Sequence, residues 1–291
     1  MKNTICNFSE IAPLKKVLMH RPGDEVLNLT PNTLERLLFD DIPYLKIAQQ
    51  EHDAYANALR NEGVEVIYLV DLVAEAIENG GRVVRKKFLE QFIAEAGVTS
   101  PKVVKHCYDY LNSFKDTKEM IRKCIAGVDI SELKKLGAVS GFYATRDTGR
   151  MIIDPIPNLY FQRDPMATIG RGATLHRMWS VTRTRESIFM EYVYQYHPFY
   201  DDTKLYYDRN EPYCIEGGDI QVLSSEVVAI GISQRTEPDA IADFARRLFK
   251  DKSNQFKYLL AIDIPDERSF MHLDTVMTQV DVDKFAVQDA I

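Results

Sequence analysis

The sequence predicts an α/β protein with an inserted all-helical segment, and three observations lead to this prediction. Strand-like runs alternate with helical periodicity near the start of the chain, almost disappear between residues 71 and 137, and return afterwards. We therefore divide the chain into a first α/β module over residues 1–70, a helical insert over residues 71–137 and further α/β modules over residues 138–291.

The first module has the order strand, helix, strand. Residues 14–20 form an apolar run that predicts a strand, and Thr30, followed by a proline, predicts the capped start of a helix. Residues 43–61 repeat apolar side chains at helical spacing and end before Gly63, and residues 64–70 are rich in β-forming residues. This order is typical of α/β proteins.

The insert contains three groups of apolar residues at helical spacing. The groups are Phe88, Leu89, Phe92 and Ile93, then Val103, Val104, Cys107, Tyr108 and Leu111, then Met120, Ile121, Cys124 and Ile125. We expect each group to form one helix, with breaks at Gly97, Asp116 and Gly127.

After the insert, strand-like patterns return. Residues 151–153 and 159–161 predict strands, and residues 220–232 predict a hairpin that turns at a pair of serines. Thr236, with an acidic residue three positions later, predicts a capped helix, and residues 258–264 predict another strand.

Composition excludes several classes of function. The chain is 45% hydrophobic and 27% charged, as globular proteins are, and 36 basic against 43 acidic residues give a net charge of −7. There is no long basic run, so we expect no nucleic-acid partner. No apolar stretch reaches the ~20 residues that span a bilayer, and residues 1–13 lack the pattern of a secretory signal. We expect a cytoplasmic protein without a membrane partner.

The four cysteines, Cys6, Cys107, Cys124 and Cys214, are scattered along the chain. No two have the spacing of a zinc site or a redox pair, so we expect no metal and no cofactor. Cys107 and Cys124 lie among apolar residues at helical spacing, which predicts small, buried and reduced side chains.

Polar residues concentrate in four segments, each at the end of an apolar run, where α/β proteins place functional groups. The segments are NLYFQRDP (158–165), IEGGD (215–219), SQRTE (233–237) and MHLDT (271–275). They and their surroundings contain the acids Asp164, Glu216, Asp219 and Asp274, the base His272, and the cations Arg163, Arg183, Arg185 and Arg235. In a strand, His272 and Asp274 would point to one face, and a nearby carboxylate would raise the imidazole pKa. His272 is therefore a candidate general acid and base.

Each of these residues also has a structural interpretation. Asp164 before a proline is typical of a turn former, and Gly217–Gly218 is typical of a tight turn. Arg183 could lie on a solvated helix face, and Arg235 could pair at the surface with the glutamate two residues later. His272 alone fits either interpretation. Without HExxH, P-loop or GxGxxG, the residues by themselves indicate only an enzyme-like α/β site with acids, a histidine and arginines.

In combination, the ordered segments resemble the arginine deiminase family. EIAPLKKVLMHRP (10–22), LLFDD (37–41), QEHD (50–53), NLYFQRDP, EGGD, GISQRTE and MHLDT follow that family's order across nearly the whole chain, and the helical insert lies where the family has one. The resemblance implies a pentein-type fold, the five-bladed α/β propeller of guanidino-modifying enzymes, built from ββαβ modules around a pseudo-fivefold axis.

The resemblance also implies catalytic roles. Asp164 and Asp274 match the acids that bind the substrate guanidinium, Glu216 matches the acid beside the histidine, and His272 matches the general acid and base. The implied reaction is hydrolysis of L-arginine to L-citrulline and ammonia through a cysteine thiouronium intermediate, in arginine catabolism.

Four further residues match substrate contacts of the family. Arg183 and Arg235 match the cations that hold the substrate α-carboxylate, and Phe161 and Asn158 match contacts around the substrate. The family also often forms homo-oligomers, but the residues of this chain do not determine an oligomeric state.

The family's nucleophile lies in a glycine-rich run that leads to Cys-Met-Ser-Met-Pro, and this chain stops at Ile291 before such a motif. Cys214 matches a strand residue of the family and not the nucleophile. We therefore expect a fragment with an incomplete propeller that forms no citrulline alone. Its unpaired strand edges would favour aggregation or exchange of segments between copies.

Several alternatives remain open. Dimethylarginine hydrolases, agmatine deiminases and amidinotransferases share the expected fold; the insert argues against the first, and two carboxylate anchors, Arg183 and Arg235, argue against agmatine. A shortened relative could bind guanidino compounds without catalysis. A metal-dependent hydrolase could use Asp164, Glu216, His272 and Asp274 as ligands. A structural interaction module is the last alternative.

Overall fold

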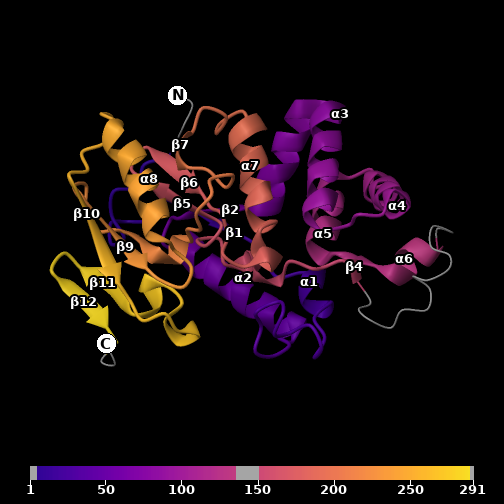
Figure 1. Ribbon diagram of the computed structural model, residues 1–291, viewed down its shortest axis with the longest axis horizontal. Helices are drawn as coiled ribbons and strands as arrows, with labels where there is room; N and C mark the ends of the chain where they lie inside the picture. Colours follow the sequence, from indigo (N-terminus) through magenta and orange to yellow (C-terminus); the bar gives the residue numbers. More distant parts are fainter. Residues whose placement is uncertain (1–4, 136–150, 289–291) are drawn as a thin grey trace. The chain divides into compact units, whose positions relative to one another are not determined.

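The computed structural model describes residues 5–135 and 151–288, and over these ranges the chain has the predicted mixed α/β fold (Figure 1). The chain divides into two compact units. The first unit comprises residues 16–160 and 195–198, and the second unit comprises residues 1–15, 161–194 and 199–291. The module boundary expected between residues 137 and 138 lies outside the described residues.

The first unit begins with the predicted order of strand, helix and strand. Its elements are β1 (Lys16–Met19), α1 (Asp24–Leu27), α2 (Leu45–Asn61) and β2 (Glu65–Tyr68). Strands β1 and β2 are parallel, as a connection through helices requires. The strand predicted over residues 64–70 is shorter than expected, because a long helix already begins at Leu69.

The capped helix predicted at Thr30 is wrong. Residues 31–38 form consecutive turns, and the backbone N–H of Thr30 donates to Thr33 Oγ1 at 3.0 Å. Leu38 has a φ of +61°, in the left-handed region that a leucine seldom adopts. This conformation ends the turn before a regular helix can continue.

Helices form where the insert was expected to be helical. They are α3 (Leu69–Glu95), α4 (Pro101–Asn112) and α5 (Thr117–Ala126), followed by α6 (Ile130–Lys135). Helix α3 is kinked at Gly81, whose φ of +64° is non-helical, a break that the sequence analysis did not predict. The three expected breaks are confirmed: Gly97 and Gly127 have φ values of +74° and +81°, and the Asp116 side chain accepts the first free N–H groups of α5. Cys107 and Cys124 are buried, as predicted.

Two short strands and a 3-10 turn follow. β3 (Val128–Asp129) pairs antiparallel with the predicted strand β4 (Met151–Ile153). Residues 159–161, predicted as a strand, are not one, because Pro157–Tyr160 forms the 3-10 helix η2. A proline cannot donate to a strand ladder, and the backbone N–H of Leu159 instead donates to the Ile156 carbonyl at 3.3 Å.

The second unit repeats one order of elements twice. The first set is β5 (Met166–Ile169), β6 (Gly172–Leu175), α7 (Glu186–Tyr196) and β7 (Lys204–Tyr207). The second set is β8 (Ile220–Val222), β9 (Val227–Ile232), α8 (Pro238–Lys250) and β10 (Tyr258–Asp263). In each set an antiparallel hairpin is followed by a helix and a strand parallel to the second hairpin strand. The chain therefore contains two successive ββαβ modules.

The predicted hairpin over residues 220–232 and the strand after α8 are both confirmed. The capping box predicted at Thr236 is wrong: α8 begins after Glu237, whose side chain does not cap the helix, and the Thr236 hydroxyl donates to Asp219 at 2.6 Å. A further hairpin, β11 (Met277–Asp281) with β12 (Lys284–Val287), follows the second module.

One hydrophobic core joins the two ββαβ modules. Helix α8 contributes Ala240, Ile241, Phe244 and Leu248, which belong to the same cluster as the inward residues of β5, β7, β8 and β9. The site described below lies at the ends of these strands, so this core holds its loops in place. Among the described residues, no helix is both long and apolar enough to cross a membrane.

The core predicts the effect of a cavity at Phe244, which is fully buried. Phe244→Ala should lower the free energy of unfolding of the second unit by about 3–5 kcal/mol, because the transfer free energy is lost and a cavity remains. Urea unfolding followed by the fluorescence of Trp179, the single tryptophan, reports on this unit. Arg246→Ala on the same helix is the control, since a mostly exposed ion pair contributes at most about 1 kcal/mol. Equal losses in the two variants would contradict this core.

Candidate active site

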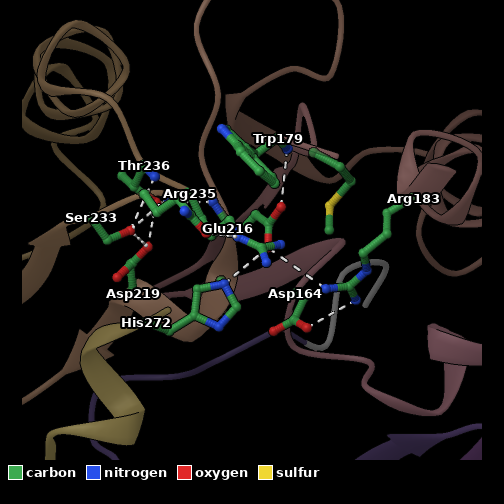
Figure 2. A network of polar contacts seen from close by, with 12 residues as sticks. Asp164, Trp179, Arg183, Glu216, Asp219, Ser233, Arg235, Thr236 and His272 are labelled. Carbon is green, nitrogen blue, oxygen red and sulfur yellow. Dashed lines mark hydrogen bonds and ion pairs between the residues drawn. The ribbon is translucent and has the colours of Figure 1, made fainter. Parts of the chain in front are cut away.

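Glu216 is the centre of a buried polar cluster in the second unit (Figure 2). Its side chain is completely buried, and its Oε2 lies 2.9 Å from His272 Nε2. The same oxygen lies 3.7 Å from Arg183 Nη1 and 3.8 Å from Arg235 Nη1. The other oxygen, Oε1, accepts the backbone N–H of Trp179 at 3.0 Å. One carboxylate thus contacts a histidine, two guanidinium groups and the main chain.

The electrostatics of the pair favour charge on both partners. Burial by itself raises the pKa of Glu216, but the hydrogen bond to His272 and the charges of Arg183 and Arg235 lower the pKa below its usual value. Burial lowers the pKa of His272, but the bond to Glu216 and the charge of Asp164 raise it above its usual value. Both shifts favour the carboxylate–imidazolium form of the pair, which suits a histidine that donates a proton.

Arg183 is held by two carboxylates. It ends the 3-10 helix η3 (Val181–Arg183) and is almost completely buried, so the interpretation as a solvated helix face is wrong. Its guanidinium donates to Asp164 Oδ2 at 2.9 Å and to both oxygens of Glu186 at 2.8 Å. Burial raises the pKa of Glu186 to about 7, although Arg183 opposes this effect. A guanidinium held by carboxylates is the same chemistry that a bound guanidino compound would require.

Arg235 has free donor capacity. It is only 3% exposed, and its guanidinium lies over the ring of Trp179 at 4.6 Å from the ring centroid. Its Nη1 is buried and makes no hydrogen bond within the described protein. The surface pair with Glu237 is therefore wrong, and the Glu237 carboxylate instead accepts the backbone N–H of Cys214. A buried donor without an acceptor is costly unless an anion completes it.

The expected strand geometry of His272 and Asp274 is wrong. His272 is extended and precedes the 3-10 helix η6 (Leu273–Thr275), which contains Asp274. The 3-10 turn replaces the alternation of a strand, so His272 is buried while Asp274 is exposed. Asp274 therefore does not share the face that we expected.

The two glycines of EGGD permit close packing. A Cβ atom on Gly217 would lie 2.0 Å from the carbonyl oxygen of Arg163, and a Cβ on Gly218 would lie 2.6 Å from the ring of His272. Only glycine lets the 3-10 helix η4 (Gly217–Asp219) lie against both segments. Gly217 and Gly218 do form a tight turn, as the structural interpretation predicted, and this turn brings Glu216 beside His272.

The remaining predicted residues lie elsewhere. Phe161 belongs to the second unit and is 45% exposed. Asn158 belongs to the first unit, where its side-chain amide donates to the Leu37 carbonyl at 2.7 Å. Substrate contacts by these two residues stay predictions.

Sequence reasoning missed the roles of Trp179 and Glu186. Glu186 follows Arg183 by three positions, a spacing at which opposite charges on a helical turn meet, so the pair was detectable. The single tryptophan of the chain, in a loop beside two arginines, was also a signal. Asp219 was noted as an acid without a role, and it lies completely buried next to the cluster.

Three of the four residues in the metal hypothesis do come together. The ligand atoms of Asp164, Glu216 and His272 lie within 4.8 Å of one another. The fourth, Asp274, is exposed. Two guanidinium groups within 4 Å of Glu216 already compensate its charge and would repel a divalent cation. These guanidinium groups repel any cation that enters, and a metal ion of charge +2 is repelled about twice as strongly as a guanidinium of charge +1.

Cys214 does not have the lowered pKa of an activated thiol, although Arg177 acts to lower it. Its Sγ contacts the carbonyl of Met178 at 3.8 Å, and burial together with the charge of Glu237 raises its pKa. A nucleophilic cysteine requires a lowered pKa. Burial also raises the pKa of Cys107, to about 12.

Comparison with known proteins agrees with this chemistry. Residues 35–291 match the model of the arginine deiminase family. The arginine deiminases of Treponema denticola and Clostridium perfringens are each 50% identical to this chain, over 97% of the chain and 69% of their own length. A solved amidinotransferase from Microseira wollei is similar in fold alone, with a TM-score of 0.50 and 15% identity over 97% of this chain and 69% of its own.

The matched segment covers both ββαβ modules and every residue of the polar cluster around Glu216. The identity to the two deiminases extends over nearly the whole chain. This chain belongs to the arginine deiminase family.

Proposed function

We propose that this chain is the larger part of an arginine deiminase, which hydrolyses L-arginine to L-citrulline and ammonia in arginine catabolism. The observation that carries the proposal is the buried Glu216–His272 pair, with Asp164 on one side and the incompletely bonded Arg235 on the other. The pair supplies proton transfer, the acids suit a guanidinium, and Arg235 suits a carboxylate. L-Arginine has both of these charged ends.

The guanidinium end of the substrate is assigned to Asp164 and Glu216. Oxygen atoms of both lie within 4.8 Å of each other and of a nitrogen of His272, so one small planar group can contact all three. Carboxylates bind a guanidinium through parallel N–H···O bonds, which orient its carbon as well as hold it. Asp274, which the family resemblance also implies, is exposed, and its carboxyl lies close enough to His272 and Asp164 for their charges to act on its pKa.

The carboxylate end is assigned first to Arg235. Its Nη1 already lacks a hydrogen-bond acceptor, whereas the guanidinium of Arg183 is bonded to Asp164 and Glu186. Arg183 can join Arg235 only if it exchanges one of these carboxylates for that of the substrate. We therefore propose Arg235 as the principal anchor and Arg183 as the second one.

The proposed chemistry is covalent. A cysteine thiolate attacks the guanidinium carbon, His272 gives its proton to the departing ammonia, and an S-linked thiouronium forms. His272, now neutral, takes a proton from water, whose oxygen attacks the same carbon; the C–S bond then breaks and citrulline leaves. Glu216 fits the role of holding the imidazole in place and favouring its protonated form.

The cysteine nucleophile is assigned to a part of the protein outside this chain. Cys214 has a raised pKa and Cys107 and Cys124 are buried, so none of these three has the surroundings of an activated thiol. The chain covers 69% of the length of its relatives. We propose that the nucleophile belongs to the remaining part, and that this chain alone forms no citrulline.

The five-bladed propeller is likewise a proposal. Two successive ββαβ modules and the β11–β12 hairpin support it, since repeated modules of this kind are what such a propeller requires. We also propose that the chain divides into a first module (1–70), a helical insert (71–137) and later modules (138–291). The complete protein is proposed to be a cytoplasmic homo-oligomer.

The alternative functions differ in whether the ligand has a carboxylate for Arg235 to bind. An agmatine deiminase needs no carboxylate anchor, and an amidinotransferase also needs a second amine acceptor. A non-catalytic guanidino-binding protein would keep the ligand selectivity of the site and lack only turnover. Ligand selectivity therefore separates arginine binding from agmatine binding, whatever the later chemistry.

The Arg235 assignment predicts discrimination between two ligands. L-Arginine should bind at least about tenfold tighter than agmatine, which corresponds to ~1.4 kcal/mol, because agmatine has no carboxylate for Arg235. Titration followed by the fluorescence of Trp179 measures both, since this ring lies against Arg235. Arg235→Ala should abolish the difference by weakening L-arginine alone, and Arg246→Ala is the control. Equal affinities in the wild type, or no binding of either ligand, would contradict the assignment.

The Glu216–His272 pair predicts a pH dependence. His272 should titrate above the usual value of about 6.5, and Glu216→Gln should lower its pKa because burial then acts without the carboxylate. A raised folded-state pKa gives stability that is fully present below about pH 6.5 and lost as the pH rises through the folded value. NMR titration of the imidazole, assigned with His272→Gln, measures the shift. A pKa that does not change in Glu216→Gln would show that the pair is not formed in solution.

The exclusion of Cys214 predicts the outcome of one substitution in the complete protein. Cys214→Ser should leave the rate of citrulline formation unchanged within about twofold, because a thiol with a raised pKa contributes no nucleophile. Colorimetric measurement of citrulline checks this. Loss of activity with retained folding would identify Cys214 as the nucleophile.

A further inference from the structure

We propose that Asp219 is the positioning residue of this site: its buried carboxylate holds together the three segments that bear Glu216, Arg235 and His272. The inference rests on the proposed function only for the identity of the ligand. The three segments are η4 with its preceding residue, the loop between β9 and α8, and the start of η6. They are far apart in sequence, so tertiary contacts must set their relative positions.

Asp219 accepts hydrogen bonds from two of the segments directly (Figure 2). Its Oδ2 accepts the hydroxyl protons of Ser233 at 2.7 Å and Thr236 at 2.6 Å, both from the loop between β9 and α8. Its Oδ1 accepts the backbone N–H of Leu273, the residue after His272, at 2.9 Å. Asp219 itself belongs to the third segment, three residues after Glu216.

Ser233 and Thr236, which donate to Asp219, also bond to the main chain of Arg235 and Glu216. The Oγ of Ser233 accepts the backbone N–H of Arg235 at 3.0 Å. The Oγ1 of Thr236 accepts the backbone N–H of Glu216 at 3.1 Å. Each hydroxyl therefore donates to Asp219 and accepts from the main chain of a site residue. The network leaves one relative placement for the acid, the cation and the histidine.

The backbone is shaped around this carboxylate. A Cβ on Gly231 of β9 would lie 2.4 Å from Asp219 Oδ1, and a Cβ on Gly218 would lie 2.6 Å from the His272 ring. Glycine is therefore required at Gly231 for Asp219 to lie this close to β9, and at Gly218 for His272 to lie this close to η4. The ring of His272 and the carboxylate of Asp219 are packed as neighbours against glycine backbone.

Stability alone does not explain a charge at this position. Burial raises the pKa of Asp219 to about 6, although the charge of His272 and the donors Thr236, Ser233 and Leu273 oppose the shift. A carboxylate with a raised folded-state pKa is ionised at neutral pH at a cost to folding. The burial of this charge is therefore weak evidence for a role in stability.

The test compares Asp219→Asn with a matched control. Asparagine keeps an acceptor for Leu273 but presents an NH₂ donor to two hydroxyls, which disrupts their common orientation. Asp251→Asn is the control, because Asp251 likewise accepts from three side chains of the second unit, Lys204, Tyr206 and Ser253, and none of them touches the site. Binding is measured by Trp179 fluorescence under conditions in which circular dichroism shows each variant fully folded.

Asp219→Asn should weaken both L-arginine and agmatine at least about tenfold, whereas Asp251→Asn should bind both as the wild type does. Wild-type affinity in folded Asp219→Asn would overturn the proposal. So would an equal loss in Asp251→Asn, since the effect would then be general destabilisation.

If Asp219→Asn does not fold, Ser233→Ala is the second test variant, because it leaves the charge of Asp219 in place. It removes the hydroxyl that holds the main chain of Arg235. L-Arginine binding should therefore weaken several-fold while agmatine binding does not change, a selectivity that general loosening cannot produce. Unchanged L-arginine binding, or an equal loss for both ligands, would overturn the proposal.

A separate readout distinguishes failure of this proposal from failure of the proposed function. If the wild-type chain binds neither ligand, the assignment as an arginine deiminase site fails, but the positioning role remains testable. Iodide quenching of Trp179 reports how firmly Arg235 covers its ring. Quenching should increase in Asp219→Asn and not in Asp251→Asn. Identical quenching in the wild type and Asp219→Asn would overturn the positioning role.

Discussion

The site depends on the burial of one carboxylate. Glu216 is completely removed from solvent, and its charge is tolerable only because His272, two guanidinium groups and a backbone N–H surround it. Each neighbour is therefore confined to one place. The same confinement orients the imidazole and keeps Arg235 directed into the cluster with an unused donor.

The fold provides this confinement through repetition. Two ββαβ modules share a hydrophobic core, and the site residues Arg183, Glu216 and His272 lie in or directly before short 3-10 helices. The 3-10 turns η3, η4 and η6 fix the backbone next to Arg183, Glu216 and His272, and the glycines of η4 let its backbone approach Arg163 and His272 closely. Strands supply rigidity, and the turns supply the directions in which the side chains point.

Much of the fold was predictable because it depends on local pattern. Helix α2, the helices α3 to α5, the hairpin β8–β9 and strand β10 follow from periodicity and from glycine or aspartate at their ends. The failures have local causes that periodicity does not capture. Leu38 adopts a positive φ, prolines convert an apolar run into η2, and the Thr236 hydroxyl bonds to a distant carboxylate instead of capping a helix.

By itself, the sequence determined the α/β class, the helical region, the acids, histidine and arginines of the site, and, through ordered motifs, the family. Only the tertiary structure decided how these groups pair. It placed Arg235 over Trp179, confined Arg183 between two acids, put Asp274 in a 3-10 turn instead of a strand and gave Asp219 three donors. The physical reason is that secondary structure follows from neighbours in sequence, whereas charge pairing and burial depend on residues that only folding brings together.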